Sequence, residues 1–315
     1  MTATRRQSTP TWPSLRVEDW ADTRDTLHMW TQIVGKIRLV HAPLVNHWWN
    51  VTLYVSPRGL TTSSIPYGRS RMFDIEFDFV DHQLRIRTDD GGTRLVALEP
   101  KPVAQFYSEL MQALDELGIE TEIRATPNEV DPAIPFAEDH QHASYDARAA
   151  HLFWRQLVQA DRVMQQFRSH FIGKVSPVHF FWGAVDLACT RFSGRTAPTH
   201  PGGAPNCGDW VMEEGYSHEL SSCGFWPGGG DEGAFYSYAY PEPEGFANSP
   251  VGPAGALYSQ ENGQFLLPYE AVRTAPDPDA ALMEFLQSTY DAAAERGGWD
   301  RDGLEHDPDR WDHRR

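Results

Sequence analysis

The sequence lacks any apolar run long enough to cross a membrane. A membrane-spanning helix needs about 20 apolar residues, whereas the apolar stretch 178–185 is far shorter. The segment after Met1 has two Arg and no apolar core, so we expect no signal peptide.

The three cysteines, Cys189, Cys207 and Cys223, include no Cys-x-x-Cys pair. This excludes a zinc ribbon and a disulfide framework, and we expect unpaired thiols in a cytoplasmic protein.

Positive charge is also scarce, since Lys and Arg number 27 against 44 Asp and Glu, a formal net charge of −17. Contact with nucleic-acid phosphates needs a basic stripe, so we expect neither a nucleic-acid nor a membrane partner.

The sequence has no Walker loop, dinucleotide-binding glycine motif, His-Glu-x-x-His motif or nucleophile-elbow serine. The glycine run 228–230 lacks a following Lys-Ser/Thr and is typical of a turn.

Aromatic residues are plentiful, with 11 Trp, 11 Tyr and 16 Phe. Such rings fill cores or line sites for flat or apolar ligands. Hydrophobic periodicity predicts helices over 21–39, 102–117 and 145–171 and from 277 onward, and strands near 51–55, 73–79, 84–87, 94–98, 119–123, 216–222, 235–240, 256–259 and 264–267. We expect Gly35 to end the first helix.

This order of elements predicts an α+β fold with two similar halves, each an antiparallel sheet packed by helices. The expected parts are a disordered tail (1–13), a first half (14–123), a linker (124–144), a second half with a long bracing helix (145–298) and a polar tail (299–315).

Short matches between the halves suggest an internal duplication. The segment 35–41 aligns with 173–179, and Ser56-Pro57-Arg58 aligns with Ser193-Gly194-Arg195. Trp30-x-Gln32 is echoed by Trp154-x-Gln156. We therefore expect Gly35 to superpose on Gly173 and Arg58 on Arg195, and 180–192 to form a strand matching 42–55.

Polar side chains are gathered among aromatic ones in the second half. We expect His179, Arg191, Arg195 and His218 to converge on one concave surface, with Trp182 and Tyr238 in its wall. The catalytic candidates that transfer protons are His179 and His218. The substrate-binding candidates are Lys174, Trp182, Arg191, Arg195, Glu219 and Tyr238. The repeat adds Lys36, His41 and Arg58, so the groove is expected in the second half or between the halves.

Each of these residues also fits a purely structural role. His179 and His218 could be core histidines bonded to carbonyls, and Arg191 and Arg195 could pair with Asp186 or Glu219. A metal triad of His179, His218 and Glu219 lacks helical spacing, so no metal is assigned.

Two main classes of function stay open, and the oligomeric state and any cofactor stay undetermined. One is an enzyme for a small anionic, partly apolar or aromatic substrate. The other is a non-catalytic protein that binds a small molecule or cofactor. A protein-interaction module is a third alternative.

Several strings of the sequence resemble a bacterial family catalogued as domain of unknown function 5996, over roughly residues 12–304. The strings are Gly35-Lys36-Ile37-Arg38, Asn46-His47-Trp48-Trp49, Arg58-Gly59-Leu60-Thr61-Thr62, Ser176-Pro177-Val178-His179-Phe180-Phe181-Trp182-Gly183, Thr190-Arg191-Phe192-Ser193-Gly194-Arg195, Tyr216-Ser217-His218-Glu219 and Gly224-Phe225-Trp226-Pro227-Gly228. The resemblance implies a bacterial protein of unassigned activity and supplies no catalytic residue.

Overall fold

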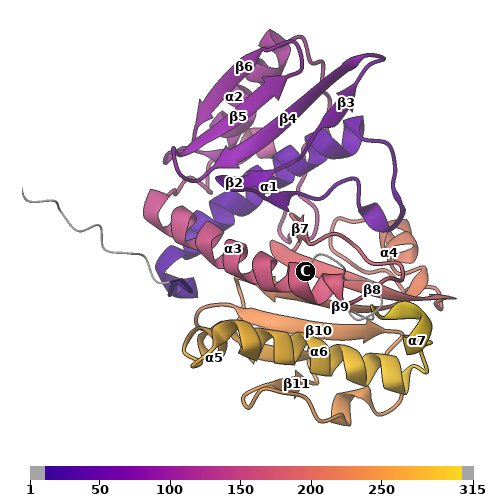
Figure 1. Cartoon of the computed structure of the whole chain (residues 1–315). Coiled ribbons are helices and arrows are strands. Elements are labelled where there is room, and N and C mark those ends of the chain that lie inside the picture. Colours follow the sequence, from indigo (N-terminus) through magenta and orange to yellow (C-terminus); the bar gives the residue numbers. More distant parts are fainter. Residues whose placement is uncertain (1–10, 307–315) are drawn as a thin grey trace, which may run out of the picture.

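Two antiparallel sheets organise residues 11–306, the part of the chain that the computed structural model describes (Figure 1). The first sheet has the order β1-β2-β4-β5-β6, with β3 beside β4: β1 (Tyr54–Val55), β2 (Gly59–Thr61), β3 (Ile65–Tyr67), β4 (Arg71–Asp78), β5 (Gln83–Thr88) and β6 (Thr93–Ala97). The second has the order β11-β12-β10-β9-β8-β7: β7 (His179–Phe181), β8 (Asp186–Thr196), β9 (His218–Trp226), β10 (Ala234–Tyr240), β11 (Leu257–Ser259) and β12 (Gln264–Pro268). The predicted α+β class is confirmed.

The helices are distributed along the whole described chain. The α-helices are α1 (Ala21–His41), α2 (Val103–Glu116), α3 (Ala147–Ser169), α4 (Asp209–Gly215), α5 (Tyr269–Arg273), α6 (Pro278–Arg296) and α7 (Arg301–Leu304). The 3-10 helices are η1 (Val17–Trp20), η2 (Asn46–Trp48), η3 (Phe136–Glu138) and η4 (Phe246–Asn248). Asp146 caps α3 and Asp277 caps α6 by accepting bonds from first-turn amides, which satisfies donors that a helix start leaves free.

Apolar and acidic residues alternate along β4, which gives the first sheet one buried apolar face. Phe73, Ile75 and Phe77 are at most 3% exposed, and Phe77 stacks on Phe106 of α2, which in turn stacks on Trp30 of α1. A two-residue period places these rings on one side of the sheet and the intervening acidic residues on the other. The first core therefore lies between this sheet and helices α1 and α2.

Helices α3 and α6 cover one face of the second sheet, and Figure 1 shows α3 running between the two sheets. The predicted stripe of α3 is confirmed, because Phe153, Leu157, Met164 and Phe167 are all buried. On the opposite face of the second sheet, His47 of η2 stacks on Phe192 of β8, and η2 is hydrogen-bonded to α4, so residues from both halves lie beside this face.

Several local predictions are wrong for tertiary reasons. Gly35 lies inside α1, where an added Cβ would come within 2.1 Å of Trp182 Nε1, so the glycine makes room for a ring instead of ending the helix. Gly173 lies in the loop after α3, so Gly35 and Gly173 are not equivalent. The segment 119–123 forms no strand, and 42–55 is mostly η2 and turn, with only the short β1 at its end.

The expected boundaries also shift at both ends of the described chain. Trp12, expected in a loose tail, is 5% exposed and donates to Asp279. Trp299 packs against the core and α7 follows it, so the polar tail does not begin at 299. The expected disorder of residues 1–10 and 307–315 lies outside the described residues.

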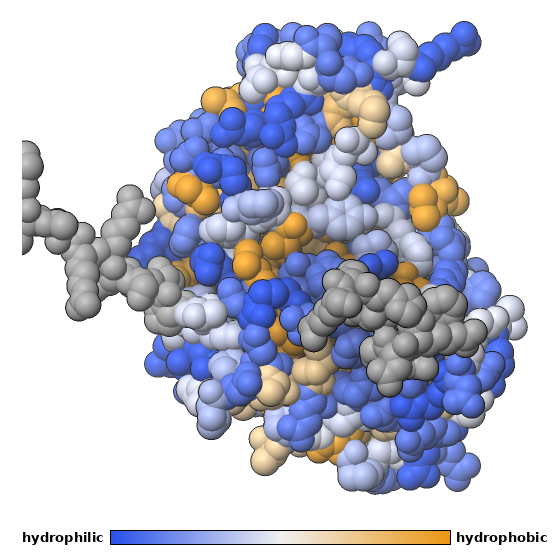
Figure 2. All heavy atoms as spheres, viewed as in Figure 1, coloured by the Kyte–Doolittle hydropathy of each residue, from blue (hydrophilic) through white to orange (hydrophobic). Residues whose placement is uncertain are grey.

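Hydrophilic residues dominate the face shown in Figure 2, where hydrophobic ones form small separate patches. Scattered apolar residues of this kind are normal for a protein surface. Over residues 11–306, no helix combines the length and the apolar composition that a membrane crossing requires.

Candidate functional site

The residues singled out from the sequence do not converge on one surface. Consecutive residues of a strand point to opposite faces. Arg191 on β8 contacts Phe167 of α3, whereas the adjacent Phe192 packs against His47 on the other face. The expected convergence of His179, Arg191, Arg195 and His218 is therefore wrong, and the set divides over both faces and an edge.

Arg195 is occupied by structural partners. Its Nε donates to Glu219 at 2.7 Å, and its Nη1 and Nη2 donate to the carbonyls of Gly298 and Gly297 at 3.1 and 2.6 Å. These carbonyls lie at the end of α6, where a helix leaves acceptors free and favours a cation. A cavity of about 170 Å³ lies beside Arg195, but the guanidinium points into its own contacts. Arg195 and Glu219 thus hold α6 against the sheet edge.

Trp182 and Tyr238 also have internal partners. Trp182 Nε1 donates to the Val51 carbonyl at 2.8 Å, and its ring fills the space that Gly35 leaves in α1. The Tyr238 hydroxyl lies 2.9 Å from that of Tyr216, two residues before His218. Trp182 is therefore part of the packing between the halves, whereas Tyr238 borders the region of His218 through Tyr216.

His179 is enclosed by aromatic rings. It is 0% exposed, and its ring centre lies 5.9 Å from that of Trp49 and 5.5 Å from that of Tyr54. Neither ring nitrogen has a hydrogen-bond partner among the described residues. Burial, together with the charges of Arg38 and Arg168, lowers the pKa of His179 to about 3, so the ring is neutral near pH 7. A fully enclosed imidazole of this kind does not reach a substrate.

Lys174 and His218 come together around a residue from the first half, His47. Lys174 Nζ lies 2.6 Å from His47 Nε2, and the His47 and His218 rings are 5.6 Å apart. Glu214 of α4 accepts a bond from the His47 backbone amide at 2.9 Å. We call His47, Lys174, Glu214 and His218 the His47 cluster.

The η2 segment reaches this position through an uncommon backbone. His47 and Trp48 have φ values of 56° and 59°, in the left-handed region that non-glycine residues seldom occupy. His47 Nδ1 donates to the Gly215 carbonyl at 2.8 Å, and Trp48 Nε1 donates to the Val211 carbonyl at 2.8 Å. These two bonds to α4 hold the segment in place. Strained conformations of this kind are kept where the surroundings enforce them, often at functional sites.

Aromatic rings form the floor of the His47 cluster. The His47 ring stacks on Phe192 at 4.4 Å, and Lys174 Nζ lies 4.9 Å from the centre of Phe192 and 5.6 Å from that of Trp49. Burial lowers the pKa of Lys174. Burial also lowers the pKa of His47, which the adjacent charge of Lys174 lowers further. With Nδ1–H donating to a carbonyl, His47 is a neutral imidazole whose Nε2 accepts the hydrogen bond from Lys174.

Lys174 is unusual among the lysines of this chain, of which there are three. Lys36 and Lys101 are 3% and 4% exposed, whereas Lys174 is half-buried. Within residues 11–306, Lys174 makes no ion pair, and the buried Oε2 of Glu214 has no hydrogen-bond partner. The cluster therefore holds a cation without an ion pair, two imidazoles and a carboxylate with one oxygen that has no hydrogen-bond partner among the described residues.

Sequence reasoning missed His47 and Glu214. The available signal was the string Asn46-His47-Trp48-Trp49, in which polar side chains stand next to aromatic ones as they do in the second half. Glu214 had no signal, since its role depends on the docking of η2 against α4.

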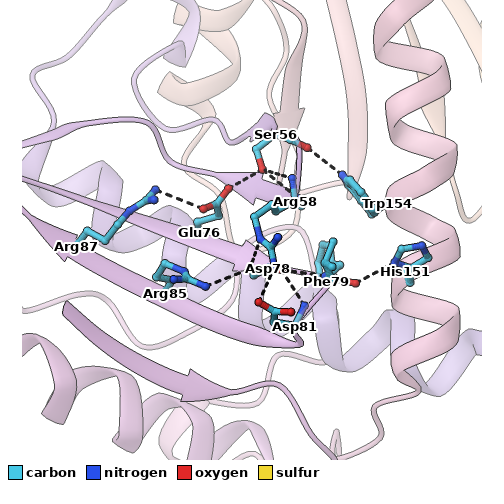
Figure 3. A network of polar contacts seen from close by, with 12 residues as sticks. Ser56, Arg58, Glu76, Asp78, Phe79, Asp81, Arg85, Arg87, His151 and Trp154 are labelled. Carbon is cyan, nitrogen blue, oxygen red and sulfur yellow. Dashed lines mark hydrogen bonds and ion pairs between the residues drawn. The ribbon is translucent and has the colours of Figure 1, made fainter.

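The polar residues expected from the first half are used internally. Arg58 donates to Asp78 and Asp81, in a network that Figure 3 shows between β4, β5 and α3. The same network includes a bond of 3.0 Å from Trp154 Nε1 to the Ser56 carbonyl, which ties α3 to the first sheet.

Lys36 and His41, the other two residues expected from the first half, also have partners within the protein. Lys36 donates to Asn128, and His41 Nε2 lies 2.9 Å from the Thr121 hydroxyl. The first half thus contributes His47 to the cluster, and not Lys36, His41 or Arg58.

No three His, Cys, Asp or Glu side chains of the described part are placed to hold a metal ion together. Comparison with known proteins gave no curated protein and no solved structure that matches the chain. A family model matches residues 12–306, nearly the whole chain, as the resemblance of the sequence strings predicted. The chain belongs to the family of unknown function DUF5996.

Proposed function

We propose that the protein is an enzyme for a small substrate with an anionic group, which binds at the His47 cluster. The observation that supports this most strongly is the contact of 2.6 Å between Lys174 Nζ and His47 Nε2. In a chain with 44 acidic residues, this half-buried cation has an imidazole nitrogen as its partner. Among the described residues no carboxylate oxygen lies within 4.0 Å of it, and the charge of Glu214 acts on it from farther away. A cation without an ion-pair partner remains available for an anionic ligand.

The geometry suggests a role for each group. Lys174 would bind the anionic group, and the half-buried ring of Trp49 would contact an apolar or aromatic part of the substrate. His47 and His218 would transfer protons, because a neutral imidazole with one nitrogen fixed by a carbonyl presents the other as a base. Glu214 would position His47 through the backbone amide of that residue.

Ligand screening of two matched charge variants tests this proposal. Lys174→Met keeps the aliphatic stem and removes the charge, and Arg148→Met removes an exposed charge on α3 that makes no ion pair among the described residues. A panel of small carboxylates, phosphates and aromatic acids is screened by thermal shift. We expect compounds that stabilise the wild type and Arg148→Met but lose about tenfold or more in affinity for Lys174→Met, as expected for a lost charge-assisted bond.

Incubation of such a compound with the protein, followed by proton NMR, separates catalysis from binding. New product signals that disappear in His47→Gln and His218→Gln support the enzyme. An unchanged compound supports the non-catalytic alternative. Equal affinity of every hit for wild type and Lys174→Met contradicts binding at this cluster.

We also propose that the halves arose by duplication, with a register that differs from the one read around Gly35. Both halves begin with a helix carrying Trp-x-Gln, at Trp30 and at Trp154, 124 residues apart. In both Ser-x-Arg segments, the serine hydroxyl accepts from the arginine amide, and the arginine Nε donates to a carboxylate on the next strand. The superposition of Arg58 on Arg195 stays a prediction. A solved relative that contains only one such half would test it, because both halves of this chain should superpose on that single unit.

A further inference from the structure

Four cationic side chains are buried in the described part of the chain, namely Lys36, Arg38, Lys101 and Arg191. Lys101 pairs with Glu109 at 2.6 Å. Arg191 is the most deeply buried of the four, at 1% exposure, and no described carboxylate lies within 4.0 Å of its guanidinium. An arginine stays charged at any ordinary pH, and a buried charge without a counter-charge is costly.

The internal contacts of Arg191 use only part of its guanidinium. Nη2 donates to the Phe167 carbonyl in the last turn of α3, a position that favours a cation. The guanidinium carbon lies 3.5 Å from the ring centre of Phe167 and 4.2 Å from that of Tyr290, so cation–π attraction offsets part of the desolvation. Nε is buried and has no hydrogen-bond partner among the described residues.

This incompletely bonded cation lines a cavity of about 230 Å³, with His170, Gln287, Glu305 and His306. Two imidazoles and an amide thus line the cavity together with the guanidinium. Glu305 is the carboxylate of this lining, and it is already bound by Arg301 and by the Tyr290 hydroxyl. The charge of Glu305 also acts on Arg191, but from beyond ion-pair distance, so the guanidinium has a polar lining and no ion-pair partner among the described residues.

We propose that this cavity is a binding site for a small oxyanion, a carboxylate or a phosphate-like group, held by Arg191 and flanked by His170 and His306. The planar fork of arginine matches the paired oxygens of such groups. Pockets for drug-sized ligands measure about 300–1,000 Å³, so this smaller cavity fits an inorganic oxyanion or a short organic acid. The site lies on the face of β8 opposite the His47 cluster and is independent of it.

Calorimetric titration of the full chain with sulfate and with sodium acetate tests the proposal, with chloride at equal ionic strength as the reference. Sulfate represents a tetrahedral oxyanion and acetate a carboxylate, so their relative affinities show which source of oxyanion the site prefers. We expect saturable binding of at least one of them by the wild type, and a loss of about tenfold or more in Arg191→Gln, since one charge-assisted contact is removed.

A second pair of variants keeps the test decisive if Arg191→Gln fails to fold. Gln287→Glu places a carboxylate at the cavity wall, where it competes for the guanidinium, and Gln287→Met is its uncharged control of similar size. We expect Gln287→Glu to abolish binding and Gln287→Met to change it less than about threefold, because only the first adds an opposing charge. Equal binding by both variants, or no saturable binding by the wild type, overturns the proposal. Lys174→Met is expected to leave oxyanion binding at Arg191 unchanged. A failure of the present proposal can therefore be told apart from a failure of the proposed site at the His47 cluster.

Discussion

Leu53 and Phe180 join the two sheets through a pair of backbone hydrogen bonds of 2.9 and 2.8 Å. Leu53 directly precedes β1, Phe180 lies in β7, and both residues are 0% exposed. The bond from Trp154 of α3 to the Ser56 carbonyl adds a second connection nearby. The halves therefore share buried contacts in addition to the linker.

We predict that this shared packing makes both sheets unfold in one transition. Phe180→Ala is expected to lower the free energy of unfolding by about 3–5 kcal/mol, the usual cost of truncating a buried phenylalanine. Leu95→Ala is a control at an exposed β6 position and is expected to change it by less than about 0.5 kcal/mol. Urea unfolding is followed by circular dichroism and by tryptophan fluorescence. Two separate transitions in the wild type contradict a shared core.

Arg195→Ala is expected to act on stability, in contrast to the ligand-binding role anticipated from the sequence. The variant removes the Glu219 contact and both donors to the end of α6, so the free energy of unfolding should fall by about 1–2 kcal/mol. Arg195→Lys keeps a charge but loses the fork, and an intermediate loss is expected. A stability equal to wild type in Arg195→Ala indicates that these bonds contribute nothing.

His179→Phe is expected to stabilise the protein, because it replaces a buried imidazole without partners among the described residues by an apolar ring of similar shape. The gain near pH 7 should be about 1 kcal/mol, the lower range for an unsatisfied buried polar group. The unfolded chain takes up the His179 proton near 6.5, and the folded protein only at about 3. Wild-type stability therefore falls as the pH drops across this window, and the advantage of the variant grows.

Chemical unfolding at pH 7 and pH 5 measures this difference, with His140→Phe at an exposed position as the control. A loss of stability in His179→Phe would show that the imidazole has a favourable partner and reopen its catalytic role.

Much of the fold was predictable because its signals are local. The alternation of Phe73, Ile75 and Phe77 predicted β4, and the apolar stripe of 145–171 predicted α3, since both periods reflect one buried face. Gly35 was misread because a glycine that ends a helix looks the same in sequence as one that accommodates a ring. The ring here is Trp182, far away along the chain.

The candidate site was less predictable, because it depends on contacts between distant segments. Lys174 and His218 both lie beside His47, which comes from the first half, so their proximity could not be read from the second half alone. Strand alternation alone implies that Arg191 and its neighbour Phe192 point to opposite faces of β8. Which face each residue takes depends on what α3 and η2 cover, and no local pattern in the sequence carries that information.

Asp186 provides the last prediction, since burial raises its pKa to about 7, aided by the charge of Glu129 and opposed by the hydrogen bond from Tyr236. Between the ordinary value of 3.8 and about 7, the folded protein holds this proton more tightly than the unfolded chain. The free energy of unfolding therefore decreases as the pH rises through this window.

Asp186→Asn keeps the shape and the acceptor for Tyr236 but cannot ionise. At pH 8 it should be more stable than wild type by about 2–4 kcal/mol, since one pKa unit corresponds to about 1.4 kcal/mol, and the difference should nearly vanish at pH 4. Urea titrations at both pH values measure it, with Asp115→Asn on the exposed face of α2 as the control. A difference that stays constant with pH would show that Asp186 ionises normally inside the sheet.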